Sequence, residues 1–289
     1  MRGKLDFKLY VITGENYHPG RGMLEVMEAA LKGGADIVQL RDKDISKRDL
    51  LEKATRLKDL TAKYNVPLIV NDHPDVALAV GADGVHLGQD DMPIAVARQI
   101  MGPDRIIGIS THRIEQAREA EEAGADYIGV GPVYATGTKP GRQPVTTAYV
   151  SQVAAEIRIP WVAIGGITPD NAIEVLNAGA SRLCAVSAVV GSEDPEAVCR
   201  RLKALIEALD RSAAHATVES EASGMFVTVN GRRSRTRAST LLELAEQYEL
   251  QGRRVVAELD GEFVPRRSWG EAPLRSGATV EFVHFVGGG

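Results

Sequence analysis

The sequence predicts an α/β protein, an eight-stranded βα (TIM) barrel followed by a smaller α+β domain. Short and almost wholly apolar runs recur through the first two thirds of the 289 residues, and helical patterns separate them. Parallel strands that are buried on both faces show this continuous apolar pattern, and eight of them in regular alternation with helices favour a closed barrel over an open sheet. A change of composition after residue 209 indicates the second domain.

Residues 1–209 contain the expected strands of the barrel. Small residues with glycine precede several of them, as in the segments that begin at Gly33 and Ala123, and glycine just beyond a helix is a common stop signal. In such barrels the active site lies at the carboxyl ends of the strands, so the polar residues that end each run are the candidates for function. The expected strands cover residues 8–13, 37–41, 67–72, 84–88, 106–110, 127–131, 160–166 and 182–188.

The chain beyond residue 209 divides into a linker and a small domain. Residues 210–224 are mostly small or polar and have no apolar periodicity, which indicates a flexible linker. Residues 225–289 contain nine arginines, no lysine and eight acidic residues. Their pattern predicts a strand at 225–231 that ends in an Asn-Gly hairpin turn, a short second strand, a helix at 240–248, and strands at 254–261 and 279–286. Mixed strands around one helix predict a β-grasp fold.

The composition restricts the partners and the location of the protein. With 34 basic and 39 acidic residues the formal charge is −5, so the chain lacks the basic character of a nucleic-acid-binding protein. No apolar run approaches the roughly 20 residues that span a bilayer, and residues 1–13 show no signal-peptide pattern, so we expect no membrane partner and a cytoplasmic protein. Cys184 and Cys199 are expected to be buried thiols. The composition leaves open whether the chain forms homo-oligomers.

Three polar residues at the end of the second expected strand point to anion binding. Gln39, Arg41 and Lys43 alternate, so an extended strand places them on one face at the mouth of the barrel. A solvated charged loop is the alternative, and spacing alone favours it.

Two aspartates follow neighbouring expected strands. Asp72 ends the third strand, and Asp91 follows the fourth by three residues. Neighbouring parallel strands lie about 4.8 Å apart, so the two carboxylates can share one Mg²⁺ ion, which completes its shell with water and phosphate. Helix capping by Asp90 or Asp91 is at least as good an interpretation, and the choice of ligand between these two residues stays open.

The ends of the seventh and eighth strands predict a phosphate site. Thr168 and Pro169 form a helix-start pattern after Gly165 and Gly166, so we expect a helix to begin directly above the two glycines. Its backbone N–H groups would bind phosphate together with the end of strand eight, at Val186 and Ser187. A tight turn without a ligand is the alternative.

The loop at 132–145 is long and rich in glycine, threonine and proline, with Lys139 at its centre. Long loops on a barrel rim are often lids. A loop without function is the alternative.

These residues occur in motifs that together resemble the thiamine-phosphate synthase family over almost the whole barrel. The resemblance implies a transferase that joins 4-amino-2-methyl-5-hydroxymethylpyrimidine diphosphate to 4-methyl-5-hydroxyethylthiazole phosphate, releases pyrophosphate and uses Mg²⁺. The motifs are QLRDK at Gln39, VND at Val70, ADGVHLGQDDM at Ala82, GIS at Gly108, GVGPVYATGTK at Gly129, AIGGI at Ala163 and AVSAV at Ala185.

The resemblance also implies the site residues. Asp72 and Asp91 would hold Mg²⁺. The reaction needs stabilisation of charge on the departing diphosphate rather than a protein nucleophile, so the catalytic residues implied are Arg41, Lys43, Ser110 and Lys139. The pyrimidine diphosphate would be bound by Gln39, Arg41, Lys43, Asn71, Ser110 and Lys139. The thiazole phosphate would be bound by Thr136, Thr138, Gly166, Val186 and Ser187.

Residues 225–289 resemble the ubiquitin-like sulfur carrier protein of thiazole biosynthesis. The motifs are MFVTVNGRR, LLELAEQY, VVAELDGEFVPRRSW and GATVEFVHFVGGG. The resemblance implies that the carboxylate of Gly289 is adenylated and then converted to a thiocarboxylate, with an adenylating enzyme and a thiazole synthase as partners. A molybdopterin-type carrier is the alternative for this domain, and only the attached barrel favours thiazole delivery.

Two alternatives remain for the barrel. It could be a related enzyme that only tautomerises thiazole phosphate, for which His112 would be a residue of interest, or an inactive scaffold for the carrier. The complete set of diphosphate-site motifs disfavours the first alternative.

Overall fold

The structure is a computed structural model that describes residues 5–137, 143–222, 224–253 and 255–284. The chain divides into two compact units, Met1–Asp210 and Arg211–Gly289. None of the helices in the described ranges combines the length and the apolar character needed to cross a membrane.

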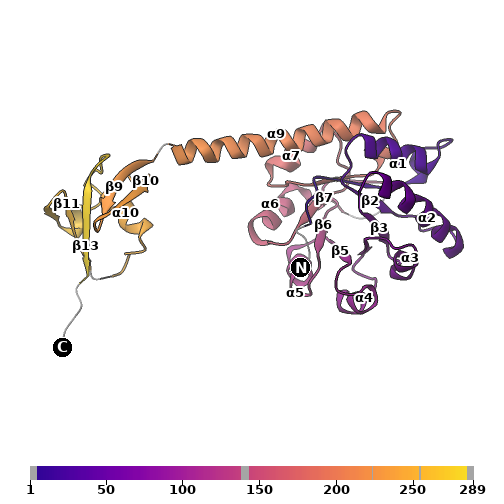
Figure 1. The fold of residues 1–289 in the computed structure, drawn as a ribbon, viewed down its shortest axis with the longest axis horizontal. Helices are drawn as coiled ribbons and strands as arrows, with labels where there is room; N and C mark the ends of the chain where they lie inside the picture. Colours follow the sequence, from indigo (N-terminus) through magenta and orange to yellow (C-terminus); the bar gives the residue numbers. More distant parts are fainter. Residues whose placement is uncertain (1–4, 138–142, 223, 254, 285–289) are drawn as a thin grey trace. The chain divides into compact units, whose positions relative to one another are not determined.

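The first unit is a closed barrel of eight parallel strands, as predicted (Figure 1). Consecutive strands pair with each other, and β1 also pairs with β8, which closes the barrel. Every strand overlaps one of the predicted runs, because a strand buried on both faces leaves an apolar run in the sequence. The strands are β1 (Leu9–Ile12), β2 (Ile37–Leu40), β3 (Leu68–Asn71), β4 (Gly84–Leu87), β5 (Ile106–Thr111), β6 (Tyr127–Val130), β7 (Trp161–Ile164) and β8 (Leu183–Ala185).

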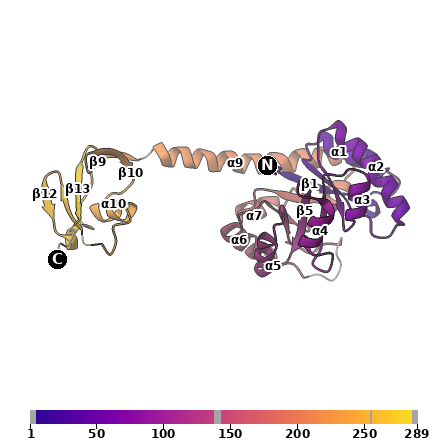
Figure 2. The same ribbon diagram turned by 60° about the horizontal axis from the view of Figure 1, so that its bottom comes forward.

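Helices alternate with the strands and cover the outside of the barrel (Figure 2). In α2 the Ser46 hydroxyl accepts a hydrogen bond from the Asp49 N–H at 3.2 Å, and Leu50, Ala54 and Leu57 form a buried stripe against the barrel. The helices are α1 (Met23–Lys32), α2 (Lys47–Lys63), α3 (Pro74–Ala79), α4 (Ile94–Met101), α5 (Ile114–Glu122), α6 (Thr146–Glu156), α7 (Ala172–Asn177), α8 (Ser187–Val190) and α9 (Pro195–Ala222), with a 3₁₀ turn η1 (Glu15–Tyr17).

The inside of the barrel is filled by an apolar cluster that includes two tyrosines, Tyr10 and Tyr127. The Phe7 ring packs edge-on against Tyr10 and Tyr127, at centroid distances of 6.0 and 6.1 Å. Ile37, Ile69 and Val162 complete this layer. The two tyrosines therefore close the inside of the barrel below the carboxyl ends of the strands.

Gly108 in β5 leaves room for the Tyr127 ring, because a Cβ atom at this position would lie 2.1 Å from Cζ of Tyr127. We expect Gly108→Ala to lower the free energy of unfolding by about 1 to 3 kcal/mol, the usual range for overpacking a core, as measured by urea denaturation. Gly22→Ala is the matched control, since Gly22 has a φ of −72° and nothing within 4 Å of the added atom. Equal losses in both variants would contradict this explanation.

Two boundaries near the predicted phosphate site differ from expectation. The helix after Gly166 begins at Ala172 rather than at Pro169. The Asn171 side chain accepts a hydrogen bond from the Thr168 N–H at 2.8 Å and donates one to the Gly166 carbonyl at 2.9 Å, which stabilises a turn instead of a first helical turn. Strand β8 ends at Ala185, so Ser187 begins α8 rather than ending the strand.

Residues 210–224 were expected to form a flexible linker, but α9 is helical as far as Ala222. This segment contains several alanines and glutamates, which have high helix propensity. Extending an existing helix needs no new nucleation, so the backbone stays helical without apolar periodicity.

The second unit is a five-stranded mixed sheet in the order β10-β9-β13-β11-β12, packed on one helix, which matches the predicted β-grasp fold. Asn230 and Gly231 have φ values of 48° and 76°, as the predicted hairpin turn requires. Strand β12 was not predicted, because three residues leave too short a pattern. The elements are β9 (Met225–Val229), β10 (Arg232–Thr236), α10 (Leu241–Gln247), β11 (Val255–Leu259), β12 (Glu262–Val264), η2 (Arg266–Ser268) and β13 (Thr279–His284).

Candidate functional site

A pocket lies at the carboxyl ends of the barrel strands, and every strand or the residues just after it contribute to its lining. Tyr10 and Tyr127 line it from below. Polar side chains from neighbouring strands therefore converge on one opening.

Most of the predicted binding residues line this pocket. Three do not line it: Lys43, Asp72 and Asp91. Thr138, Lys139 and Gly289 lie outside the described residues. The predicted residues that line the pocket are Gln39, Arg41, Asn71, Ser110, Thr136, Gly166, Val186 and Ser187.

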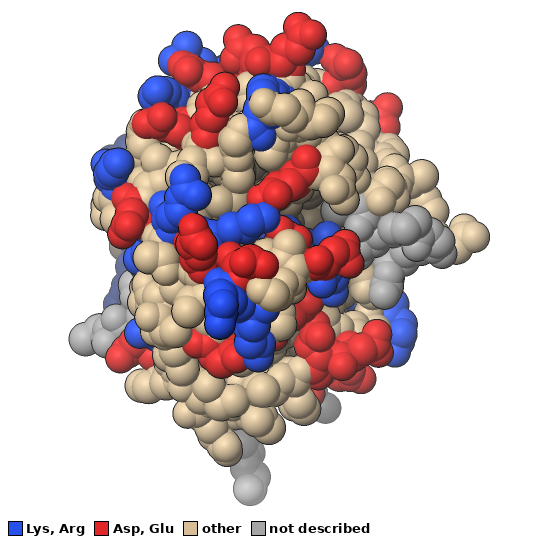
Figure 3. Space-filling model, turned by 90° about the vertical axis from the view of Figure 1, so that its right-hand side faces the viewer, with Lys and Arg blue, Asp and Glu red and all other residues tan. Residues whose placement is uncertain are grey.

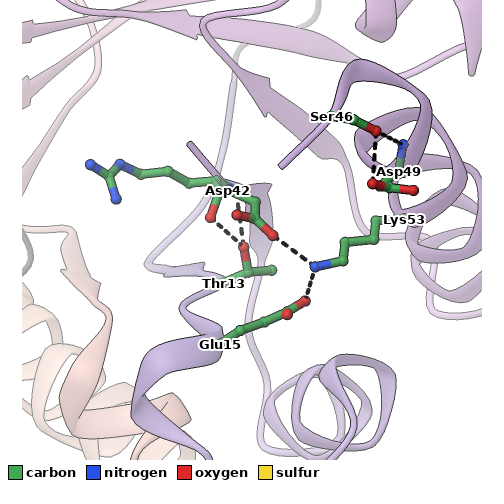
Figure 4. A network of polar contacts seen from close by, with 7 residues as sticks. Thr13, Glu15, Asp42, Ser46, Asp49 and Lys53 are labelled. Atoms are coloured by element: carbon green, nitrogen blue, oxygen red, sulfur yellow. Dashed lines mark hydrogen bonds and ion pairs between the residues drawn. The ribbon is translucent and has the colours of Figure 1, made fainter. Parts of the chain in front are cut away.

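The segment after β2 is held in place by hydrogen bonds from two sides (Figure 4). The backbone N–H of Arg41 donates to Oγ1 of Thr13 at 2.9 Å, and that hydroxyl donates to the Arg41 carbonyl at 3.2 Å. Nζ of Lys53 donates to Oδ2 of Asp42 at 2.7 Å and to Oε1 of Glu15 at 2.5 Å. The segment is therefore anchored to β1, η1 and α2, which a purely solvated charged loop would not be.

The charge of Lys53 is stabilised by this arrangement. Burial alone would lower the pKa of Lys53, but hydrogen bonds to Asp42 and Glu15 outweigh burial and raise the pKa. Lys53 thus stays protonated at neutral pH and joins the segment after β2 to η1 through its ion pairs with Asp42 and Glu15.

Asp72 and Lys43 form an ion pair at the rim. Nζ of Lys43 lies 2.8 Å from Oδ2 of Asp72, whose side chain is 17% exposed. Asp72 has a φ of 62°, and its N–H donates to the His86 carbonyl at 2.9 Å, which connects it to β4. The pair places a cation and a carboxylate together beyond the carboxyl ends of β2 and β3.

Asp91 ends a turn rather than capping a helix. Its Oδ2 accepts a hydrogen bond from the Gly88 N–H at 2.6 Å. Helix α4 begins after Pro93 and has no side-chain cap, so neither Asp90 nor Asp91 caps it. Asp90 is exposed and makes no hydrogen bond to another described residue.

The donor chemistry fits Mg²⁺ at this edge. Asn71 of β3 pairs with His86 of β4, so Asp72 and Asp91 follow adjacent strands. No group of three or more His, Cys, Asp or Glu residues in the described ranges could hold a metal ion. Two carboxylates are nevertheless what Mg²⁺ uses when water and substrate phosphate complete its shell.

A chain of hydrogen bonds runs across the pocket floor, and three of its members were not predicted from the sequence. Nε2 of Gln39 donates to the Tyr10 hydroxyl at 2.8 Å, which lies 2.8 Å from the Tyr127 hydroxyl. That hydroxyl lies 2.8 Å from Nδ1 of His86, and Nε2 of His86 lies 3.0 Å from Oγ of Ser110. The chain joins Gln39 of β2 to Ser110 of β5.

Both tyrosines of this hydrogen-bond chain keep their protons. Burial raises the pKa of Tyr10 and of Tyr127 above the usual value of a tyrosine. The signal that could have found them is strand alternation, since Tyr10, His86 and Tyr127 occupy inward positions as Gln39 does.

Two glycines after β7 shape the end of the pocket that was predicted to bind phosphate. A Cβ atom on Gly165 would lie 2.4 Å from the Pro132 backbone. Gly166 has a φ of 65°, and a Cβ atom there would lie 2.8 Å from the Ala135 carbonyl. Side chains are therefore excluded here, and the backbone itself borders the pocket.

The face in Figure 3 shows basic and acidic side chains interspersed rather than a basic patch. The mixture of charges on this face is in keeping with a net charge of −5.

Comparisons with known proteins match both units. Residues 9–189 match the family model described as thiamine monophosphate synthase, and residues 227–289 match the ThiS family. Thiamine-phosphate synthase of Halalkalibacterium halodurans is 60% identical over 203 residues, which are 70% of this chain and 96% of the relative. The enzyme of Shouchella clausii is 55% identical over 202 residues, 70% of this chain and 97% of the relative. The solved thiamine phosphate pyrophosphorylase of Pyrococcus furiosus is 41% identical, with a TM-score of 0.65, covering 70% of this chain and 96% of that one.

Proposed function

Because the chain belongs to the thiamine monophosphate synthase family through its barrel and to the ThiS family through its C-terminal unit, we propose that the barrel pocket binds both substrates of the coupling reaction. The chain is a bifunctional thiamine biosynthesis protein, and its barrel is a thiamine-phosphate synthase. The substrates are the aminopyrimidine diphosphate and the thiazole phosphate named above. The observation that carries the proposal is that residues matched to the family on separate strands line one pocket.

The reaction breaks the bond between the pyrimidine methylene carbon and the diphosphate oxygen, and the electron pair leaves with pyrophosphate. The lone pair of the thiazole nitrogen then forms the new C–N bond. Arg41, Lys43 and Lys139 neutralise the diphosphate as its charge grows, and Ser110 donates a hydrogen bond to it. Asn71 helps to position the pyrimidine diphosphate.

The thiazole phosphate binds at the opposite side of the pocket. Its phosphate accepts hydrogen bonds from the backbone around Gly166, Val186 and Ser187 and from the Thr136 and Thr138 hydroxyls. This arrangement places two phosphorylated substrates in one pocket with an aromatic floor, where water is scarce and charge interactions are strong.

Asp72 and Asp91 would hold Mg²⁺, which when bound stabilises negative charge on the pyrophosphate. Lys43, paired with Asp72, would sit beside the same group. Support comes from the adjacent strands that carry the two aspartates and from the oxygen donors that they present.

Asp91→Ala is expected to remove Mg²⁺-dependent turnover while the fold is retained, and Asp90→Ala is expected to have a milder effect. Asp91 orders its turn through the Gly88 N–H, whereas Asp90 makes no such bond. Rates of thiamine phosphate formation against Mg²⁺ concentration, with circular dichroism of each variant, check this. The reverse ranking would place the ligand at Asp90.

The C-terminal unit carries sulfur as a thiocarboxylate on Gly289, with an adenylating enzyme and a thiazole synthase as partners. Support comes from the β-grasp sheet, the match to the ThiS family and the terminal glycines. A cytoplasmic location suits both activities and the two buried thiols of Cys184 and Cys199.

The proposal is tested with the fragment 1–210, incubated with both substrates and Mg²⁺. Formation of thiamine phosphate and pyrophosphate in equal amounts supports it, and the compact first unit makes the fragment a fair test. Tautomerised thiazole phosphate without coupling would indicate the tautomerase alternative, and no reaction at all would indicate an inactive scaffold.

A further inference from the structure

The hydrogen-bond chain across the pocket floor can be followed in one direction from Gln39 to Ser110. Nε2 of Gln39 can only donate, so the Tyr10 oxygen accepts at that link. Every proton of the chain has an acceptor when the Tyr10 proton points to the Tyr127 oxygen and the Tyr127 proton points to Nδ1 of a neutral His86. A neutral imidazole that accepts at Nδ1 carries its proton on Nε2, which donates to Oγ of Ser110.

The direction of the chain decides what its two ends present to a ligand. The amide nitrogen of Gln39 is turned to Tyr10, so the amide oxygen faces the pocket. This oxygen is an acceptor, and no donor among the described residues bonds to it. At the other end Ser110 accepts from His86, so its own proton is available for donation to a ligand. Gln39 and Ser110 are 2% and 9% exposed, so water competes little for either group.

We propose that Tyr10, Tyr127 and His86 are positioning residues that hold Gln39 as an acceptor and thereby select a pyrimidine with a 4-amino group over one with a 4-oxo group. This inference rests on the proposed function of the pocket. The 4-amino group donates to the amide oxygen of Gln39. A 4-oxo group would place oxygen against oxygen, and a buried acceptor left unpaired is costly.

Burial supports this direction. Both phenols have a raised pKa and stay protonated, so each supplies one proton to the chain. Tyr10 and Tyr127 are 1% and 0% exposed, so water is not available as an alternative hydrogen-bond partner for either hydroxyl. Gln39 could turn its amide only if every link reversed together.

Tyr127→Phe is the direct test, because it removes one oxygen and cuts the chain in the middle. The Tyr10 proton then becomes free to turn to the amide oxygen of Gln39, which lets the amide rotate and present its NH₂ group. A pocket with that freedom accepts a 4-oxo ring by reorienting, so the selectivity falls while other contacts remain.

The measurement is calorimetric binding, to the full chain, of two unreactive ligands: 4-amino-2-methyl-5-hydroxymethylpyrimidine monophosphate and its 4-oxo counterpart. We expect the wild-type chain to prefer the amino ligand by about 10²-fold or more, as a site built to pair with a substrate N–H does. Tyr127→Phe should reduce that ratio by about tenfold or more, as should Tyr10→Phe, which cuts the neighbouring link.

Tyr149→Phe is the matched control. Tyr149 is a buried tyrosine, 5% exposed, whose hydroxyl lies 2.8 Å from Oγ1 of Thr111 and 2.9 Å from the Arg113 carbonyl oxygen, and it does not line the pocket. It should lose stability as Tyr127→Phe does but keep the wild-type ratio. Tyr10→Phe gives a second measurement if Tyr127→Phe does not fold.

The outcomes separate this inference from the function on which it rests. If the wild-type chain forms thiamine phosphate and the Tyr127 and Tyr10 variants keep the full preference for the amino ligand, the inference is wrong and the function stands. If the wild-type chain forms no thiamine phosphate and binds neither ligand, the proposed function fails, and this inference with it.

Discussion

Replacement of Arg41 by alanine is expected to lower kcat for thiamine phosphate formation by about 10²- to 10³-fold, the usual loss when one fixed group that stabilises developing charge is removed. Arg41 lines the pocket, and the Thr13 hydroxyl fixes its backbone from both the N–H and the carbonyl side. The backbone from which the Arg41 guanidinium extends is therefore fixed. Steady-state rates with both substrates saturating measure the effect on kcat directly.

Arg48→Ala is the matched control, since Arg48 is exposed on α2 and does not line the pocket. It removes the same charge from the molecule and should leave kcat unchanged. A similar loss in both variants would mean that general charge matters rather than Arg41 itself. An unchanged kcat in Arg41→Ala would remove this residue from the proposed machinery.

Deletion of Gly288 and Gly289 is expected to abolish adenylation of the chain and leave the coupling reaction unchanged. The deletion leaves Gly287 at the chain end with Val286 next to it, and a narrow activating site admits only residues without a side chain there. Mass spectrometry of the chain after incubation with an adenylating enzyme, ATP and a sulfur donor detects the thiocarboxylate. Thiamine phosphate formation by the same variant is the internal control.

A chain with one alanine added after Gly289 is a second control for the tail. It keeps every native residue but changes the terminal group, so it should also fail to be activated. Thiocarboxylate formed on either altered chain would contradict the assignment of Gly289. A loss of coupling activity in the deletion would show that the two units depend on each other.

The barrel could be predicted from the sequence because buried parallel strands leave a local signal. The run that contains β7, for example, is apolar throughout and ends in two glycines. The hairpin at Asn230 and Gly231 was equally local, since positive φ at both residues is what this pair favours. Boundaries set by a single side chain were not visible: Asn171 bonds back to Gly166 and delays α7 to Ala172.

The site was predictable only in part. Spacing placed Gln39 and Arg41 on one face, and the resemblance to a family supplied Asn71 and Ser110. Hydrogen bonds between residues far apart in the sequence could not be predicted: the Tyr10 and Tyr127 hydroxyls, for example, are separated by 117 positions. The ion pair of Lys43 with Asp72 also depends on the fold, because it joins the ends of two different strands.

Both substrates are expected to bind in one pocket, where the ends of separate strands surround them and a divalent cation. The most direct measurement is a crystal structure of the full chain with Mg²⁺, the thiazole phosphate and an unreactive analogue of the pyrimidine diphosphate. We predict both ligands in the barrel pocket, with Arg41 on the diphosphate and the metal bound by Asp72 and Asp91. Ligands outside the pocket, or a metal bound to the diphosphate with neither aspartate as a ligand, would contradict the account.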